Sequence, residues 1–302
     1  MTNVLAKPPW DHCYYVRPGY LMSTATNSIE NIKNFEVRDD DVFIASYPRS
    51  GTYWLTRVVR AIKTLNKSTM DVDHAIMDDL FFTLSWKPFP DSPDSSKYSS
   101  ALDKYNKCST SSPRTIGFQM LPEFLPTQYY EKKPKTIYLH RNPKDVAVSW
   151  YFYHLTSNFL GKPTSWEQYF EEFLKGNVEK GSPFENIKQW CKYKNNPDLL
   201  WIKYEDMLKD PKNEYYKVAR FLDRPMSEEE MKVVMHVCDI NYMKQFFKRD
   251  PFAQNIMTEG HKYVRQGNTG DWKNYFTVAQ NEAFDKVYHE EMKGYEDLIY
   301  QF

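Results

Sequence analysis

Apolar residues concentrate in four short runs along the chain, and polar turn residues follow each run. The runs cover residues 42–45, 114–121, 135–141 and 199–206 and read VFIA, RTIGFQML, KTIYLHR and LLWIKYED. Short apolar runs that are bounded by turn residues are typical of buried strands. The pattern therefore predicts four strands at these positions.

A helical spacing of apolar residues follows three of these predicted strands. It occurs after the first run at Val58, Val59, Ile62 and Leu65, after the third run at Val146, Val148, Tyr151 and Leu155, and after the fourth run over residues 213–222. Strands that alternate with helices form a parallel sheet with helices on both faces. We therefore expect an α/β fold, with ligands bound beyond the C-terminal ends of the strands.

A single domain is predicted over residues 1–302. Segments 87–112 and 249–277 are rich in polar and turn-forming residues, so they are interpreted as loops. Core-forming patterns flank both segments, which disfavours a linker between domains.

Composition narrows the classes of function. No run of about 18 apolar residues is present, so neither a membrane span nor a membrane partner is predicted. The N-terminal residues lack the basic and then apolar order of a signal peptide, which favours a cytoplasmic protein. Lys plus Arg and Asp plus Glu both number 40, which disfavours a nucleic-acid partner. The four cysteines are scattered without a CxxC pair, which predicts reduced thiols and no metal site.

The turn after the first predicted strand carries Arg49, Ser50, Gly51 and Thr52, just ahead of a helical pattern. The first turn of a helix presents unpaired N–H groups and a positive dipole end, so this P-loop-like turn could bind an anion. A helix capped by Ser50 or Thr52, with Arg49 exposed, fits the same residues. The nucleotide loop GxxxxGK[ST] is absent, which disfavours a kinase or an ATPase.

Two further stretches carry basic residues next to turns. In LHRNPKDVAVSWYFYH, Arg141 ends a predicted strand and Ser149 lies about two helical turns later, so both could hold a phosphate. Ser149 fits equally well as an ordinary helical residue. In RQGNTGDWKNYFT, Gly267 and Gly270 would let the backbone approach a ligand beside Arg265.

The stretches YPRSGTYWL, RNPKDVAVS and RQGNTGDWKNYFTVAQNE together resemble the cytosolic sulfotransferases, in the order of that family and over almost the whole chain. These enzymes transfer a sulfuryl group from 3′-phosphoadenosine 5′-phosphosulfate (PAPS) to a hydroxyl or amine of a small acceptor. The resemblance implies donor binding, without a metal, by Arg49, Ser50, Gly51, Thr52, Tyr53, Trp54, Arg141, Ser149, Tyr204, Arg265, Gln266 and Gly267.

The resemblance also implies a homodimer. The stretch KNYFTVAQNE matches a short dimer motif of the family at Lys273, Thr277, Val278 and Glu282. The same residues fit the start of a C-terminal helix.

Two departures from the family pattern concern the catalytic residues. Arg49 stands where the family usually has lysine, and its very high pKa makes it an electrostatic catalyst rather than a proton donor. The segment RTIGFQMLPEFLP places Gln119 at the position of the family's histidine base and Gly117 at that of its lysine. A glutamine orients an acceptor but takes no proton, and a general base contributes ~10²–10⁴-fold in rate.

Three hypotheses address the missing base. Another histidine substitutes for it, with His140, His12 and His74 as the candidates. Alternatively, the acceptor needs little help from a base, as with an acidic phenol or a neutral amine. In the third, the protein binds PAPS or its product, adenosine 3′,5′-bisphosphate (PAP), without efficient turnover and has a regulatory or carrier role.

The acceptor pocket is expected to be apolar and aromatic, suited to a planar small molecule. The resemblance places five aromatic residues in segments that line it, and each of them could instead be core: Phe81, Phe82, Trp86, Phe152 and Tyr153.

Overall fold

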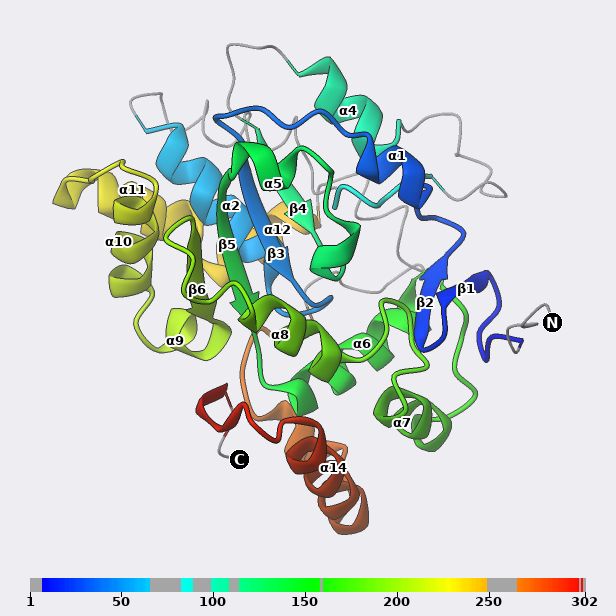
Figure 1. Ribbon diagram of the computed structural model, residues 1–302. Helices are drawn as coiled ribbons and strands as arrows, with labels where there is room; N and C mark the ends of the chain where they lie inside the picture. The colour runs from blue at the N-terminus through cyan, green and yellow to red at the C-terminus, as the bar shows by residue number, and fades with distance from the viewer. Residues whose placement is uncertain are drawn as a thin grey trace.

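The computed structural model describes residues 7–65, 83–88, 99–108, 114–157, 160–248, 265–298 and 300. At its centre lies a sheet of four parallel strands, in the order β4-β3-β5-β6 (Figure 1). The strands are β3 (Val42–Ser46), β4 (Thr115–Phe118), β5 (Lys135–His140) and β6 (Leu199–Lys203). The predicted parallel sheet is therefore confirmed, and each strand falls within or beside its predicted run.

Helices cover both faces of the sheet (Figure 1). One face packs against α2 (Thr52–Lys63), α9 (Tyr204–Lys209), α10 (Pro211–Phe221), α11 (Glu228–Val237) and α12 (Ile240–Phe247). The other face packs against α1 (Ile29–Lys33), α4 (Ala101–Lys107), α5 (Tyr129–Lys132) and α8 (Pro183–Cys191). Successive strand residues point to opposite faces, so Phe43 and Ile44 belong to different clusters.

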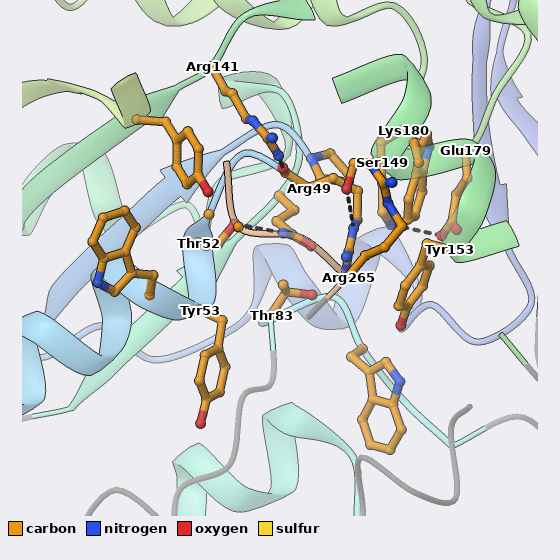
Figure 2. A pocket seen from close by; sticks show the side chains of 18 of the residues that line it. Arg49, Thr52, Tyr53, Thr83, Arg141, Ser149, Tyr153, Glu179, Lys180 and Arg265 are labelled. Atoms are coloured by element: carbon orange, nitrogen blue, oxygen red, sulfur yellow. Dashed lines mark hydrogen bonds and ion pairs between the residues drawn. The ribbon is translucent and has the colours of Figure 1, made fainter. Parts of the chain in front are cut away.

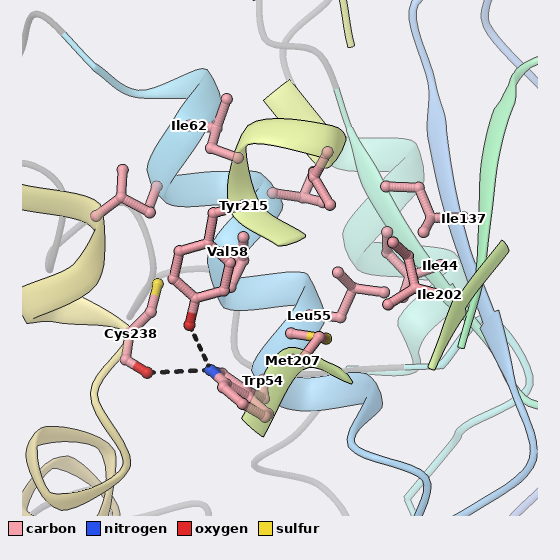
Figure 3. Packing of buried hydrophobic residues seen from close by; sticks show 14 of the residues in the cluster. Ile44, Trp54, Leu55, Val58, Ile62, Ile137, Ile202, Met207, Tyr215 and Cys238 are labelled. Atoms are coloured by element: carbon pink, nitrogen blue, oxygen red, sulfur yellow. Dashed lines mark hydrogen bonds between the residues drawn. The ribbon is translucent and has the colours of Figure 1, made fainter. Parts of the chain in front are cut away.

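The α2 side of the sheet forms a continuous apolar layer (Figure 3). Leu55, Val58 and Ile62 lie at helical spacing on α2 and pack over the strand residues Ile44 and Ile137. All five side chains are fully buried. This packing fixes the start of α2 at the C-terminal end of β3.

A third group of elements lies at the C-terminal ends of the strands. It contains α6 (Pro143–Thr156), α7 (Trp166–Leu174) and α14 (Val278–Glu291), which share one aromatic-rich cluster. An antiparallel hairpin of β1 (Cys13–Arg17) and β2 (Tyr20–Ser23) packs beside them. The short helices η2 (Pro122–Phe124), η3 (Asp271–Asn274) and η4 (Glu296–Leu298) complete the described elements.

Two expectations need correction. The hairpin of β1 and β2 was not predicted, so two strands precede β3 in the chain. Segment 87–112, interpreted as a loop, contains α4, because Ser100 accepts from the amide of Asp103 and caps that helix. Segment 249–277 is described from residue 265 onward and contains η3. Among the helices of the described ranges, none is both long and apolar enough to cross a bilayer.

Candidate active site

The turn between β3 and α2 brings the start of the helix to a cavity. Gly51 is the N-cap of α2 and has a left-handed φ of 99°. A Cβ on this residue would lie 2.7 Å from Cδ2 of Tyr204, so glycine is required here. No side chain in the described part of the chain caps α2, so the alternative of a cap from Ser50 or Thr52 is wrong. Residues 51–54 line the cavity, and their amides can serve an anion.

Two arginines interlock at this turn (Figure 2). Nε of Arg49 donates to Oγ of Ser149 over 3.3 Å, and its guanidinium lies 4.5 Å from the ring centroid of Tyr153. Nη1 of Arg141 donates to the carbonyl oxygen of Arg49 over 3.0 Å, and its guanidinium lies 4.4 Å from the ring centroid of Tyr204. Nε of Arg141 is buried and has no hydrogen-bond partner among the described residues. Two fixed positive charges therefore meet where β3 and β5 end.

The third basic segment closes the same cavity. Residues 265–268 line it, and Nη2 of Arg141 donates to the carbonyl oxygen of Asn268 over 2.9 Å. The guanidinium of Arg265 is paired with Asp271. Three arginines from distant parts of the sequence thus surround one space, and an anion bound there would gain charge-assisted hydrogen bonds.

A clamp on α6 holds this third segment in place. The carboxylate of Asp145 accepts hydrogen bonds from the backbone N–H of Gly270, over 2.8 Å, and of Trp272, over 3.0 Å. The buried ammonium of Lys144 pairs with Asp285 over 2.5 Å and lies 4.4 Å from the ring centroid of Trp272. Lys144 and Asp145 therefore position the segment that contains Arg265.

An aromatic wall lies next to the arginines. The rings of Trp54 and Tyr204 meet edge to face with centroids 5.6 Å apart, and both line the cavity. Nε1 of Trp54 donates to the hydroxyl of Tyr215 over 2.9 Å and to the carbonyl oxygen of Cys238 over 3.0 Å (Figure 3). These bonds lock the indole, which leaves a flat apolar surface suited to a planar base.

The cavity has a volume of about 190 Å³ and brings most of the predicted residues together. It is lined by Arg49, Gly51, Thr52, Tyr53, Trp54, Trp86, Gln119, Arg141, Ser149, Tyr153, Tyr204, Arg265, Gln266 and Gly267. Ser50 is buried behind the turn and does not line it. Phe152 packs on the guanidinium of Arg265, at 4.7 Å, and so supports a cation instead of lining the cavity. Phe81 and Phe82 lie outside the described residues.

Gln119 occupies the cavity wall beside the turn. Its Nε2 donates to Oγ1 of Thr52 over 2.9 Å, and that hydroxyl also lies 2.5 Å from Oγ of Ser46. Gly117 lies within β4, where it pairs with Ile44 of β3 and adds no charge to the site. The wall at this point therefore offers an amide that is held by α2.

Neither of the two histidine candidates that the structure describes lines the cavity. His140 does not line the cavity; its side chain is buried, and Nδ1 lies 2.8 Å from the hydroxyl of Tyr300. Burial, reinforced by the charges of Lys203 and Lys194, lowers the pKa of His140 to about 3. His12 is exposed and away from the cavity, and His74 falls outside the described residues.

The acceptor pocket is expected to be apolar and aromatic, and this stays a prediction because Phe81 and Phe82 lie outside the described residues. One part of the cavity wall that the structure describes is polar. Along with Trp86 and Tyr153 it contains Ser23, Thr26, Thr83, Ser85, Glu179 and Lys180, all of them buried. These residues come from the end of β2, the segment 83–86 and the turn before α8. Nothing in the sequence marked the hydroxyls, although Gly176 and Gly181 signal a turn around the charged pair.

Comparison of the sequence with known proteins identifies one family. The model of the sulfotransferase domain matches residues 39–296. Sulfotransferase 1B1 of Canis lupus familiaris is 38% identical over 280 residues, covering 91% of this chain and 92% of that protein. Sulfotransferase 1E1 of Homo sapiens is 36% identical over 269 residues, covering 87% of each.

Solved structures agree. The mouse sulfotransferase SULT7A1 complexed with PAP aligns with a TM-score of 0.75 and 30% identity, over 94% of this chain and 95% of that chain. Retinol dehydratase in complex with androsterone and PAP aligns with a TM-score of 0.77 over 95% and 90% of the two chains, and at 23% identity it shows a shared fold. With the domain model over most of its length and relatives above one-third identity, the chain belongs to the sulfotransferase family.

Proposed function

We propose that this sulfotransferase moves a sulfuryl group from PAPS to a hydroxyl or amine of a small acceptor, and that the cavity described above is where it does so. The convergence of Arg49, Arg141 and Arg265 on the amides that start α2 carries the proposal. PAPS is a polyanion with a flat base, and this half of the cavity offers matching cations, amides and aromatic rings.

Two phosphate positions follow from the arrangement. The amides of residues 51–54, together with the guanidinium of Arg49, suit the 5′-phosphosulfate. Arg141 suits the 3′-phosphate, because its Nε has no partner among the described residues and its two other nitrogens already tie residues 49 and 268 together. Ser149 and Gly267 complete that position, while Trp54 and Tyr204 face the base. The mouse relative is complexed with PAP, which supports a nucleotide of this kind as the ligand.

Arg49 acts as the electrostatic catalyst in this proposal. The acceptor oxygen or nitrogen attacks sulfur, a new bond to sulfur forms, and the bond from sulfur to the bridging oxygen breaks. Negative charge then grows on PAP, and the guanidinium stabilises it without giving up a proton. The bond to Ser149 and the stack on Tyr153 hold the guanidinium in place before the reaction starts.

Gln119 orients the acceptor. Its Nε2 is committed to Thr52, and its Oε1 has no hydrogen-bond partner within the described ranges, so it can accept from an acceptor O–H or N–H. An amide takes no proton at neutral pH, so the acceptor must lose its proton to solvent. The rate should therefore follow the ionisation of the acceptor, which favours acidic phenols and neutral amines.

Sulfate transfer from labelled PAPS to phenols of graded acidity, across pH 5.5 to 9, tests this function. We expect product, with a rate that rises as each phenol ionises. A binding control runs alongside: PAP at about 100 times its Kd should stabilise the fold by about 2.7 kcal/mol. Stabilisation by PAP without any product would leave a nucleotide-binding protein with a regulatory role, and an absence of both would overturn the proposal.

The assembly and compartment belong to the same proposal. Thr277 caps α14 with a capping box, and the next residue, Val278, is 77% exposed, more than any other large apolar side chain of the described residues. A homodimer through Lys273, Thr277, Val278 and Glu282 would cover it. Cytoplasm is the compartment that the family resemblance implies, and the four cysteines are free thiols. Sedimentation of wild type against Val278→Glu tests the dimer, which the variant should dissociate.

A further inference from the structure

One wall of the cavity contains a buried ion pair, Glu179 and Lys180. Both residues line the cavity and are only 5% and 6% exposed. Figure 2 shows the two side chains next to each other, on the same side of the view as Ser149 and Tyr153 and away from Arg141. A role for this wall in binding the acceptor rests on the proposed function. Charged side chains are rarely buried unless they are paired or used.

The backbone is built to present this pair. The amide of Lys180 donates to the carbonyl oxygen of Leu21 over 2.8 Å, which ties the turn to β2. Lys180 and Gly181 both have a left-handed φ, of 68° and 69°. A Cβ on Gly181 would lie 2.8 Å from the ring of Tyr20. The carbonyl oxygen of Gly181 accepts a hydrogen bond from the hydroxyl of Tyr47 over 2.7 Å. A non-glycine residue held at positive φ by so many contacts is a feature that clusters at functional sites.

The hydrogen bonds of the pair are incomplete. Oε1 of Glu179 accepts from Oγ of Ser23 over 2.9 Å and lies 3.6 Å from Nζ of Lys180. Its Oε2 has no hydrogen-bond partner in the described part of the chain. Nζ of Lys180 has three protons, yet its one hydrogen bond, to Oγ1 of Thr26, is long at 3.4 Å. The pair therefore keeps one good acceptor and at least one good donor for a ligand.

The charges decide which ligand group fits. A cationic group could donate to the carboxylate of Glu179, and an anionic group could accept from the ammonium of Lys180. Each of them, however, would add an uncompensated charge to a buried site. A hydroxyl both donates and accepts, so it can bond Oε2 and Nζ together without adding charge. The neighbouring hydroxyls of Ser23 and Thr26 extend the same polar surface.

We propose that Glu179 and Lys180 determine acceptor specificity by binding a second, neutral hydroxyl group of the acceptor, away from the group that is sulfated. The preferred acceptors are therefore diols or hydroxyalkyl phenols, and not purely apolar phenols. A site built around a hydroxyl discriminates strongly against its deoxy analogue, because the analogue leaves buried polar groups unpaired.

Equilibrium binding of matched probes to the protein–PAP complex tests this inference without requiring turnover. The probes are para-alkylphenols of increasing chain length and the para-hydroxyalkylphenols that carry one terminal hydroxyl. For wild type we expect the hydroxylated member to bind roughly 10- to 100-fold tighter at the chain length that reaches the pair. In Glu179→Gln/Lys180→Met, which removes both charges together, the preference should fall to about 3-fold or less.

An exposed ion pair offers the matched control. Lys212 on α10 and Glu228 on α11 lie 2.7 Å apart, exposed and outside the cavity, so Glu228→Gln/Lys212→Met should keep the full preference. The isosteric single variant Glu179→Gln keeps the shape of the side chain and should lose most of the preference. It therefore keeps the test valid if the double variant misfolds. A wild-type preference absent at every chain length, or unchanged in both Glu179 variants, would overturn the inference. Tighter binding of the matching ammonium or carboxylate probes would overturn it as well. Probe binding with this preference but no sulfate transfer would count against the proposed function alone.

Discussion

The two halves of the cavity are built in different ways. Most residues of the donor half follow parallel strands, and Ser149 and residues 265–267 complete it. This half relies on backbone amides and on guanidinium groups that other residues hold in place. The acceptor half consists of hydroxyls and one ion pair, taken from a hairpin and two turns that lie far apart in the sequence. In the proposed function, the first half binds the same donor in every reaction, whereas the second half binds the acceptor. The comparison suggests that changes in the donor half should affect all acceptors equally, while changes in the acceptor half should alter the ranking among them.

Removal of the charge at Arg49 should have the largest effect. Arg49→Ala is expected to lower kcat by about 10²–10³-fold for every acceptor, because the charge on the leaving PAP loses its stabilising group. Steady-state kinetics with two unrelated phenols measures this. Arg49→Lys is the matched control and should retain most of the activity, since it keeps a positive charge. An effect confined to one acceptor would move Arg49 out of the donor half.

Loss of Arg141 should come next. Arg141→Ala removes a charge-assisted contact with phosphate and should weaken PAP binding by about 2–3 kcal/mol, or roughly 30- to 150-fold in Kd. Calorimetric titration with PAP measures it. The exposed Arg220 on α10 supplies the control, because Arg220→Ala should leave Kd unchanged. Equal affinities in the two variants would remove Arg141 from the phosphate site.

Glycine substitutions separate backbone strain from crowding in the donor half. Gly51→Ala should lower the free energy of unfolding by about 1–3 kcal/mol, because φ is 99° and the new Cβ would meet Tyr204 at 2.7 Å. Gly294→Ala also has a positive φ, of 85°, but its Cβ meets nothing within 4 Å, so it should cost only about 1 kcal/mol. Denaturant unfolding compares the two. PAP binding should suffer in the first variant alone.

A histidine at position 119 should have the smallest effect and sharpen the boundary between the halves. Gln119→His should raise kcat/KM for weakly acidic phenols by roughly 10-fold at neutral pH, since a base near the acceptor becomes available. The new pH profile should titrate near the ordinary histidine pKa of about 6.5, with activity rising above it. Acidic phenols, which ionise without help, should gain little. A profile identical to that of wild type would show that the acceptor atom is bound elsewhere.

The sequence predicted much of the donor half because those residues follow strands. Apolar runs located β3 and β5, parallel strands end at one edge of the sheet, and so Arg49 and Arg141 had to lie close together. Trp54 and Tyr204 were added by resemblance to the family. These predictions depend on local pattern and on a motif, both of which the sequence carries.

The acceptor half could not be predicted in the same way. Ser23 and Thr26 meet Glu179 and Lys180 only because the turn before α8 pairs with β2, across more than 150 residues of chain. No periodic pattern encodes such a pairing. His140 illustrates the opposite error: its place next to Arg141 in sequence suggested catalysis, but strand alternation turns its side chain away from the cavity, against Tyr300.

The clamp at Asp145 gives the donor half an internal reporter. The amides of Gly270 and Trp272 both donate to the carboxylate of Asp145. They should therefore exchange their hydrogens with solvent only when the segment that contains them separates from α6. Their exchange rates, followed by NMR in the free protein and with PAP, would measure how often this side of the cavity opens and how far the nucleotide suppresses the opening.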